Sequence, residues 1–155
     1  MDIFQVRQSE KRLYRELLLQ GDEQWNMVEA YLDRGTMFAL RDGEVCAVCV
    51  VTEEAHDWIE IKNLAVASTV RRKGYGRRLV AFVAERWRRP GAFLYAGTGE
   101  SRATLSFYED CGFRRSHTIP RFFIDHYDHP IFEEGKQLID MVYLRMPLDA
   151  PGAAP

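Results

Sequence analysis

The residues with the most distinctive chemistry lie in one stretch, which reads RRKGYGRR over positions 71–78. Its two glycines, one residue apart, let the backbone approach a ligand closely and permit positive φ angles. If a helix starts here, its first N–H groups are unpaired and carry partial positive charge. We therefore expect an anion site in which backbone amides and the surrounding cations bind phosphate oxygens.

Two common phosphate motifs do not fit this stretch. A Walker A loop needs G-x-x-x-x-G-K-[ST], which the sequence lacks. A dinucleotide-binding turn needs a third glycine, but position 79 is leucine. A tight glycine turn with a solvated basic face is the alternative interpretation, because a short glycine motif is weak evidence by itself.

A strand must precede this turn and a helix must follow it. Residues 58–68, WIEIKNLAVAS, predict a long strand, and Leu79, Val80 and Val83 lie at helical spacing after the glycines. The alternation of apolar residues from Trp58 to Leu64 gives way to a continuous apolar run at 64–66. We interpret that run as the position of a β-bulge.

Similar patterns predict the remaining elements. A strand at 3–7 precedes a helix that starts at Ser9 and carries Leu13 on its apolar face, and a second helix follows around Trp25. A hairpin turns at 42–43, a strand covers 92–97, Thr98 or Ser101 caps the next helix, and the last strands cover 113–125 and 137–146. Strands and helices in this order predict a mixed α/β sheet with helices on both faces. We expect one domain over residues 1–148 and a C-terminal tail over 149–155.

Composition excludes several classes of protein. The chain of 155 residues has a net charge of −2, so bulk charge does not indicate a nucleic-acid binder. No apolar run is long enough to span a membrane, and no signal peptide is evident, so we expect a cytoplasmic protein. Cys46 and Cys49 read as buried strand residues on opposite faces rather than as metal ligands.

Two motifs together resemble a known family. Leu64, Val66, Arg71, Gly74 and Gly76 occupy the five defined positions of L-x-V-x-x-x-x-[RQ]-x-x-G-x-[GA], the core motif of the GNAT superfamily of N-acetyltransferases. Residues 107–113, FYEDCGF, resemble the family's downstream [FL]-Y-x-x-x-G-F motif. The resemblance covers roughly residues 1–146, and residues 121–146 are similar to a small bacterial branch, the YvbK-like acetyltransferases. It implies a mostly antiparallel sheet of about seven strands.

The resemblance implies that acetyl-CoA is the cosubstrate, with its pyrophosphate on the glycine turn and its pantetheine arm along the strand near Val66. No metal is implied. Many family members carry asparagine at the position of Ser101, where a hydroxyl replaces the amide that contacts CoA. The implied cofactor-binding residues are Leu64, Ala65, Val66, Arg71, Arg72, Lys73, Gly74, Tyr75, Gly76, Arg77, Ser101 and Tyr108.

Three residues receive catalytic roles from the resemblance. The amide of Leu64 would polarise the thioester carbonyl, and one such donor is worth about 3 kcal/mol. Tyr108 matches the tyrosine that protonates the departing thiolate, although packing in the core is an alternative reason for a tyrosine there. The attacking amine must lose a proton, either to Glu60 or to a chain of water molecules, and Glu60 could instead be a strand residue paired with Lys62.

The sequence indicates the acceptor substrate less clearly than the cosubstrate. The segment 126–136, HYDHPIFEEGK, with neighbouring Asp125 predicts either an acidic rim that attracts a cationic amine or a solvated loop. This long insert favours a small-molecule amine over a protein or peptide amine. A non-catalytic CoA-binding protein is a further alternative, and family analogy alone indicates a homodimer.

Overall fold

The computed structural model describes residues 1–149, so all but the first residue of the predicted C-terminal tail lies outside the described residues. The N-terminal half contains β1 (Asp2–Gln5), a 3-10 helix η1 (Gln8–Tyr14), α1 (Arg15–Gly21), α2 (Trp25–Leu32), β2 (Thr36–Asp42), β3 (Glu44–Ala55), β4 (Trp58–Val66) and the 3-10 turn η2 (Ser68–Val70). The C-terminal half contains α3 (Tyr75–Arg86), β5 (Phe93–Thr98), α4 (Arg102–Asp110), β6 (Arg114–Ile119), α5 (Phe122–Asp125), β7 (Phe132–Glu133), β8 (Lys136–Gln137) and β9 (Met141–Pro147).

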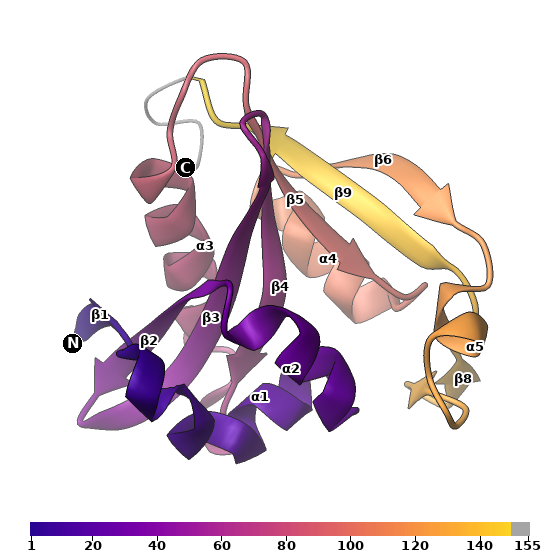
Figure 1. Ribbon diagram of the computed structural model, residues 1–155, viewed down its shortest axis with the longest axis horizontal. Helices are drawn as coiled ribbons and strands as arrows, with labels where there is room; N and C mark the ends of the chain where they lie inside the picture. The colour runs from indigo at the N-terminus through magenta and orange to yellow at the C-terminus, as the bar shows by residue number, and fades with distance from the viewer. Residues whose placement is uncertain (150–155) are drawn as a thin grey trace.

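Seven strands form one sheet in the order β1-β2-β3-β4-β5-β9-β6, while β7 and β8 form a separate ribbon. Only β4 and β5 run parallel, and every other neighbouring pair is antiparallel. The strands fan apart in the middle of the sheet, so that β1–β4 and β5-β9-β6 form two wings (Figure 1). The predicted seven-stranded, mostly antiparallel sheet is confirmed.

Helices pack on both faces of this sheet, as the sequence predicts. One core cluster places α3 and α4 residues such as Leu79 and Leu105 against Cys49 and Leu144. The other places α1 and α2 against the opposite face, where Val48 and Val50 meet Leu18. Alternation along β3 supplies both clusters, because neighbouring strand residues point to opposite faces.

Cys46 and Cys49 do not point to opposite faces, and that prediction is wrong. Leu40 pairs with Ala47 and Arg41 pairs with Val45, so Cys46 is an extra residue in β3. Such a bulge shifts the alternation by one residue. Both cysteines therefore join the same core cluster, and their predicted burial as free thiols is confirmed.

Two predicted elements have different boundaries in the structure. The first helix begins as the 3-10 segment η1 before α1, and Leu13 is 77% exposed instead of facing the core. The predicted strand over 113–125 ends at Ile119, and α5 begins at Phe122. Pro120 cannot donate to a strand ladder and the next residue has φ +58°, so the chain turns here.

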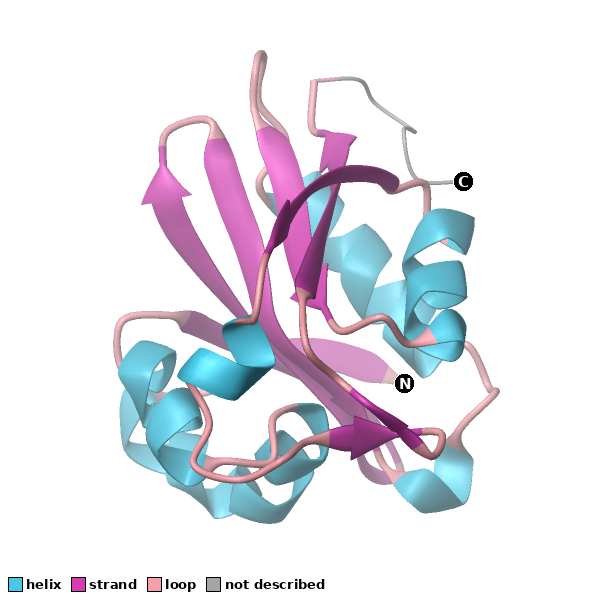
Figure 2. Cartoon of the chain, turned by 90° about the vertical axis from the view of Figure 1, so that its right-hand side faces the viewer, coloured by secondary structure: helices cyan, strands magenta, loops and turns pink. Residues whose placement is uncertain are grey.

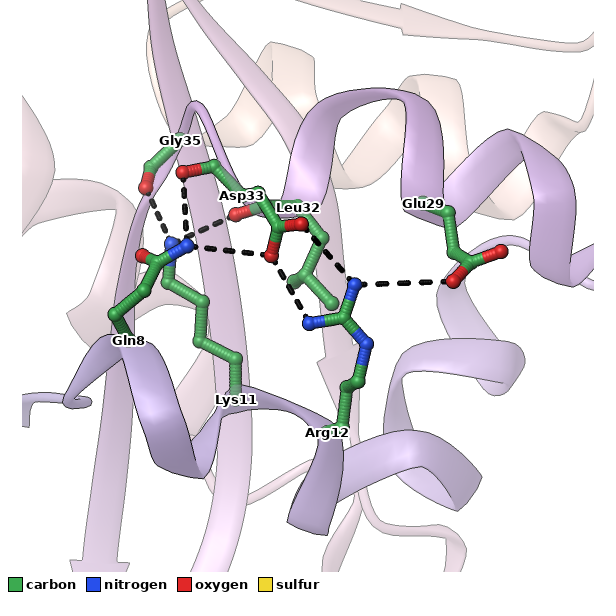
Figure 3. A network of polar contacts seen from close by, with 7 residues as sticks. All are labelled: Gln8, Lys11, Arg12, Glu29, Leu32, Asp33 and Gly35. Atoms are coloured by element: carbon green, nitrogen blue, oxygen red, sulfur yellow. Dashed lines mark hydrogen bonds and ion pairs between the residues drawn. The ribbon is translucent and has the colours of Figure 1, made fainter.

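An interior lysine and an exposed arginine connect η1 to the end of α2 (Figure 3). Lys11 Nζ donates to the carbonyls of Leu32 and Gly35, both at 2.7 Å. Arg12 makes ion pairs with Asp33 at 3.0 Å and with Glu29 at 3.7 Å on the surface. These contacts fix the position of α1, whose C-terminal end reaches the site described next.

Candidate active site

The site begins where β4 and β5 separate. Their parallel pairing extends from Trp58 only to Ile61. On the other side of β4, Val50 pairs with Asn63 and Val51 pairs with Ile61, so Lys62 is the extra residue of a bulge. The predicted bulge is real, but it lies two residues before the expected start at Leu64. Beyond the bulge, β4 diverges from β5, so the edge of β4 that faces β5 is unpaired there.

The direction of the β4 amides follows from one hydrogen bond. Ala67 N–H donates to the Cys46 carbonyl of β3 at 2.8 Å. In an antiparallel pair, alternate residues direct their backbone groups toward the partner strand and away from it. Ala65 therefore faces β3, whereas Leu64 and Val66 direct their N–H and C=O groups into the gap beside β5. The amide predicted to polarise a thioester thus faces the open side of β4.

The glycine turn presents further amides. Gly74 has φ +81° and precedes the first residue of α3, and a Cβ added to it would meet no atom within 4 Å. The first hydrogen bond of the helix runs from Arg78 N–H to the Gly74 carbonyl. The amides of residues 75–77 consequently have no partner within the helix. Gly76 lacks a side chain for a different reason. A Cβ there would lie only 3.3 Å from Phe107.

These elements enclose an open cleft of about 740 Å³. Its lining residues are Gln20, Leu64, Ala65, Val66, Arg71, Arg72, Gly74, Tyr75, Gly76, Arg77, Ala103, Thr104, Phe107, Tyr108 and Asp110. Ten of the twelve predicted cofactor-binding residues are in this set, so residues separated by up to 44 positions in the chain come together here.

Lys73 and Ser101 are the two predicted residues that do not line the cleft. Ser101 is buried and caps α4, accepting from Thr104 N–H at 3.5 Å and bonding to Glu134 at 3.1 Å. This capping confirms one of the two helix starts expected from the sequence. It also occupies the hydroxyl that was predicted to contact CoA.

Two cations in the turn have defined positions. Arg71 lies across the cleft, where its guanidinium donates to the Val66 carbonyl at 3.3 Å and to Gln20 at 3.4 Å. Arg72 adopts φ +67°, which is unfavourable for a residue with a side chain. Tyr75 contributes to the cleft wall but directs its hydroxyl to Asp42 at 2.6 Å, which ties the turn to the β2–β3 hairpin.

Tyr108 lines the cleft from α4 and is 7% exposed. Its hydroxyl forms no hydrogen bond with any residue in the part of the chain that the structure describes. Burial raises the pKa of Tyr108 above its ordinary value, and nearby Cys49 and Cys111 raise it further. The phenol therefore keeps its proton at neutral pH and can act as a proton donor.

Glu60 lies on β4, on the face of the sheet opposite to Tyr108, and is 4% exposed. Its Oε1 accepts from Trp58 Nε1 at 2.9 Å, and its Oε2 accepts from the Tyr143 hydroxyl at 2.9 Å. Lys62 Nζ lies 3.1 Å from the same Oε2. Glu60 lines neither the cleft nor the second pocket described below, but Lys62 lines that pocket.

A second pocket of about 140 Å³ adjoins the cleft. It is formed by the end of α1, by β4 and β5, and by the segment from α5 to β9. This segment faces the viewer in Figure 2. Gln20 lines both cavities, so the two meet at the end of α1. The sequence analysis missed Gln20 and Asp22, which reach this pocket from the end of α1 and carry no motif.

The acidic residues of the long insert are dispersed. Asp125 pairs with Arg121, Asp128 pairs with His129, and Glu134 bonds to Ser101. Among the predicted acidic rim, only Glu133 lines the second pocket. Within residues 1–149, no three potential ligands gather as a metal would need, and no helix is long and apolar enough to cross a membrane.

Comparison with known proteins identifies the family. A family model described as an acetyltransferase (GNAT) domain matches residues 33–115. The chain is also 38% identical over 136 residues to the uncharacterized N-acetyltransferase YvbK of Bacillus subtilis (strain 168), covering 86% of this chain and 88% of that protein.

The chain belongs to the GNAT family of acetyltransferases.

Solved acetyltransferase structures share this fold over most of the chain. An IAA acetyltransferase from Bacillus cereus ATCC 14579 has a TM-score of 0.86 at 31% identity, covering 94% of this chain and 97% of that one. A GNAT acetyltransferase from Elizabethkingia anophelis with acetyl-CoA bound has a TM-score of 0.87 at 29% identity, with the same coverage. A Bacillus subtilis acetyltransferase in complex with CoA has a TM-score of 0.84 at 36% identity, again with that coverage. Family membership confirms the predicted enzyme class, an acetyltransferase that uses acetyl-CoA, and the resemblance to the YvbK branch.

Proposed function

We propose that this enzyme transfers the acetyl group of acetyl-CoA to a primary amine of a small molecule. The observation that carries the proposal is the position of Gln20, which lines both the basic cleft and the second pocket. A donor in the cleft and an acceptor in the pocket would therefore meet at the gap between β4 and β5. This arrangement suits direct transfer in a ternary complex, because both reactants can be held in place together.

The residues of the cleft fit acetyl-CoA. Gly74 leaves open space where a side chain would block the helix N-terminus, and the free amides of α3 point there together with Arg72 and Arg77. Diphosphate oxygens suit such a site. The unpaired edge of β4 at Val66 would accept the amide-containing arm, for which Arg71 must release the Val66 carbonyl.

The chemistry requires three functions from the protein. Bound acetyl-CoA would supply the acetyl group as a thioester. A neutral amine would attack the carbonyl carbon, so that a C–N bond forms, the C–S bond breaks, and the sulfur leaves to become the free thiol once it is protonated. The Leu64 amide would stabilise the charge that develops on the carbonyl oxygen. Tyr108 would give its proton to the departing sulfur. Lys62 would give a proton to Oε2 of Glu60, which lies 3.1 Å away, and would take the proton of the acceptor amine in its place.

The second pocket favours a small acceptor. The segment from α5 to β8 covers it, and this cover is held by a hydrogen bond from the Tyr127 hydroxyl to Asp22 at 2.8 Å. An extended peptide needs an open groove instead. The pocket contains Asp22, Glu23 and Glu133 against Lys62, so its charge favours a cation.

A homodimer would form through the outer edge of β6. This strand pairs only with β9 among the strands that the structure describes, and Arg114–Thr118 are exposed. Unpaired strand edges are common sites of association. Sedimentation of the purified enzyme tests this proposal, whereas the cytoplasmic location stays a prediction from the sequence.

A screen of amines tests the proposed function. The enzyme is incubated with acetyl-CoA and with alkylamines, polyamines, aminoglycosides or short peptides, and free thiol is measured. Mass spectrometry of the product then identifies the acetylated nitrogen. Turnover of small amines supports the proposal, whereas turnover of peptides alone would assign a peptide acceptor.

A further inference from the structure

Asp22 is a carboxylate without a counter-ion in the wall of the second pocket. It follows α1 directly and its own N–H donates to the Leu18 carbonyl at 3.1 Å, which fixes its backbone. Its side chain is half-buried and lines the pocket. No lysine, arginine or histidine among residues 1–149 lies within 4.0 Å of its oxygens.

Two neutral hydroxyls hold this carboxylate in place. Tyr127 donates to Oδ1 at 2.8 Å and Tyr31 donates to Oδ2 at 3.3 Å. Tyr31 in turn accepts from Asn63 Nδ2 at 3.0 Å, which connects the group to β4. The backbone amide of Gln24 also contacts this carboxylate. Each carboxylate oxygen has two acceptor sites, so with three donors the group keeps one site for a hydrogen bond from a ligand.

Burying a charge without a partner is unfavourable, since hydroxyl groups replace only part of the lost solvation. Burial accordingly raises the pKa of Asp22. The one cation in the same pocket is Lys62, whose ammonium already pairs with Glu60. A positive group from a ligand would therefore complete the environment of Asp22.

The position of Asp22 relative to the cleft limits which part of the acceptor can carry the positive group. Gln20, two residues earlier, marks the junction of the two cavities, whereas Asp22 lines only the second pocket. Two residues span at most about 7 Å of chain. A ligand held at Asp22 would thus have one end in the pocket and the other within a short reach of the cleft.

We propose that the acceptor carries a second cationic group, as a diamine or polyamine does, and that Asp22 binds this non-reacting ammonium. This inference rests on the proposed function and specifies its substrate class. Asp22 is a specificity-determining residue in this scheme, since it contacts the substrate away from the nitrogen that is acetylated.

The test compares α,ω-diaminoalkanes of increasing length with monoalkylamines of the same length, using thiol release at saturating acetyl-CoA. The wild-type enzyme should prefer the diamine by about tenfold in kcat/KM, the ratio expected for one charge-assisted contact. The preference should appear mainly in KM. Asp22→Asn should reduce the diamine-to-monoamine ratio to near one, whereas the affinity for acetyl-CoA stays unchanged.

Two control variants separate charge from packing. Tyr127→Phe removes the hydrogen bond to Asp22 but keeps its charge, so the preference for diamines should persist. Asp125→Asn makes the same charge change outside the pocket, where Asp125 pairs with Arg121, and should have no effect on the ratio.

Each outcome bears on a definite claim. Equal kcat/KM values for diamines and monoamines in the wild type, or an unchanged ratio in Asp22→Asn, would overturn the inference about Asp22 and leave the small-amine function intact. Absence of turnover with every small amine would overturn the proposed function and the inference together. If Asp22→Asn fails to fold, as shown by lost acetyl-CoA binding, the wild-type ratio alone decides.

Discussion

The Tyr143 hydroxyl reaches across one strand to donate a 2.9 Å hydrogen bond to Glu60. Tyr143 lies on β9 and Glu60 on β4, with β5 between them. Gly97 of β5 makes this contact feasible, because a Cβ there would lie 3.1 Å from the Tyr143 ring. The buried carboxylate is therefore held by both wings of the sheet, next to the position where they separate.

Replacing Glu60 tests whether it accepts the proton of the acceptor. We expect Glu60→Gln to lower kcat by roughly 100-fold, the usual contribution of a general base, without changing the affinity for acetyl-CoA. Lys62→Met should produce a similar loss because it removes the connection between Glu60 and the pocket. Steady-state kinetics and calorimetry measure the two quantities. A normal kcat in Glu60→Gln, together with a lower melting temperature, would show that Glu60 only holds the sheet together.

Tyr108→Phe tests the proton donor. The substitution leaves the ring packed in the core and removes only the hydroxyl, so binding of acetyl-CoA should persist while kcat falls by roughly 100-fold. Because burial raises the pKa of Tyr108, its ionisation should cause no loss of activity between about pH 7 and 9. The pH dependence of kcat measures this. Undiminished turnover in the variant would remove Tyr108 from the mechanism.

Lys11 and Arg12 offer a matched pair for stability. Lys11 is 2% exposed and donates to two backbone carbonyls, so Lys11→Met would leave both without this partner. We expect the free energy of unfolding to fall by about 2 kcal/mol, which corresponds to roughly 5 °C in Tm. Arg12→Met removes exposed ion pairs and should cost less than about 1 kcal/mol. Urea unfolding of both variants measures the difference, and equal losses would contradict this assignment.

His129 should make stability depend on pH. Its hydrogen bond with Asp128, and then that with Glu23, raises the pKa of His129 in the folded state. The protonated imidazole therefore favours folding below the unfolded pKa of about 6.5, and this contribution disappears as the pH rises through the folded pKa. NMR titration should place His129 above the ordinary value and Asp128→Asn should bring it back. His129→Gln should reduce stability more at low pH than at high pH; the reverse trend would contradict the assignment.

The sequence predicts the cofactor side of the site well and the acceptor side poorly, for a physical reason. Gly74, Gly76 and Arg71 act within one short turn, so their spacing alone indicates an anion site. Asp22 and Tyr127 are 105 residues apart and meet only because the sheet brings their elements together.

Local ambiguity explains the other differences. The bulge at Lys62 leaves no mark in the alternation of residue types, whereas the apolar run at 64–66 interrupts that alternation and so predicts the bulge there. Ser101 suited either a helix cap or a CoA contact. A serine hydroxyl that caps a helix is already hydrogen-bonded to the backbone, so it is not free to contact CoA. Leu13 matches a helical apolar face in the sequence, but the 3-10 geometry of η1 turns it to solvent.

The proposal that backbone amides beside Gly74 bind the diphosphate of acetyl-CoA is tested most directly by calorimetry on two glycine variants. Gly74 and Gly91 both have positive φ, +81° and +76°, and a Cβ at either would meet open space. Glutamate at either position therefore causes similar backbone strain, but only Gly74→Glu places bulk and negative charge in the cleft. We predict that the wild type and Gly91→Glu bind acetyl-CoA equally well and that Gly74→Glu shows no binding. Equal affinity in all three proteins would contradict the assignment of this turn.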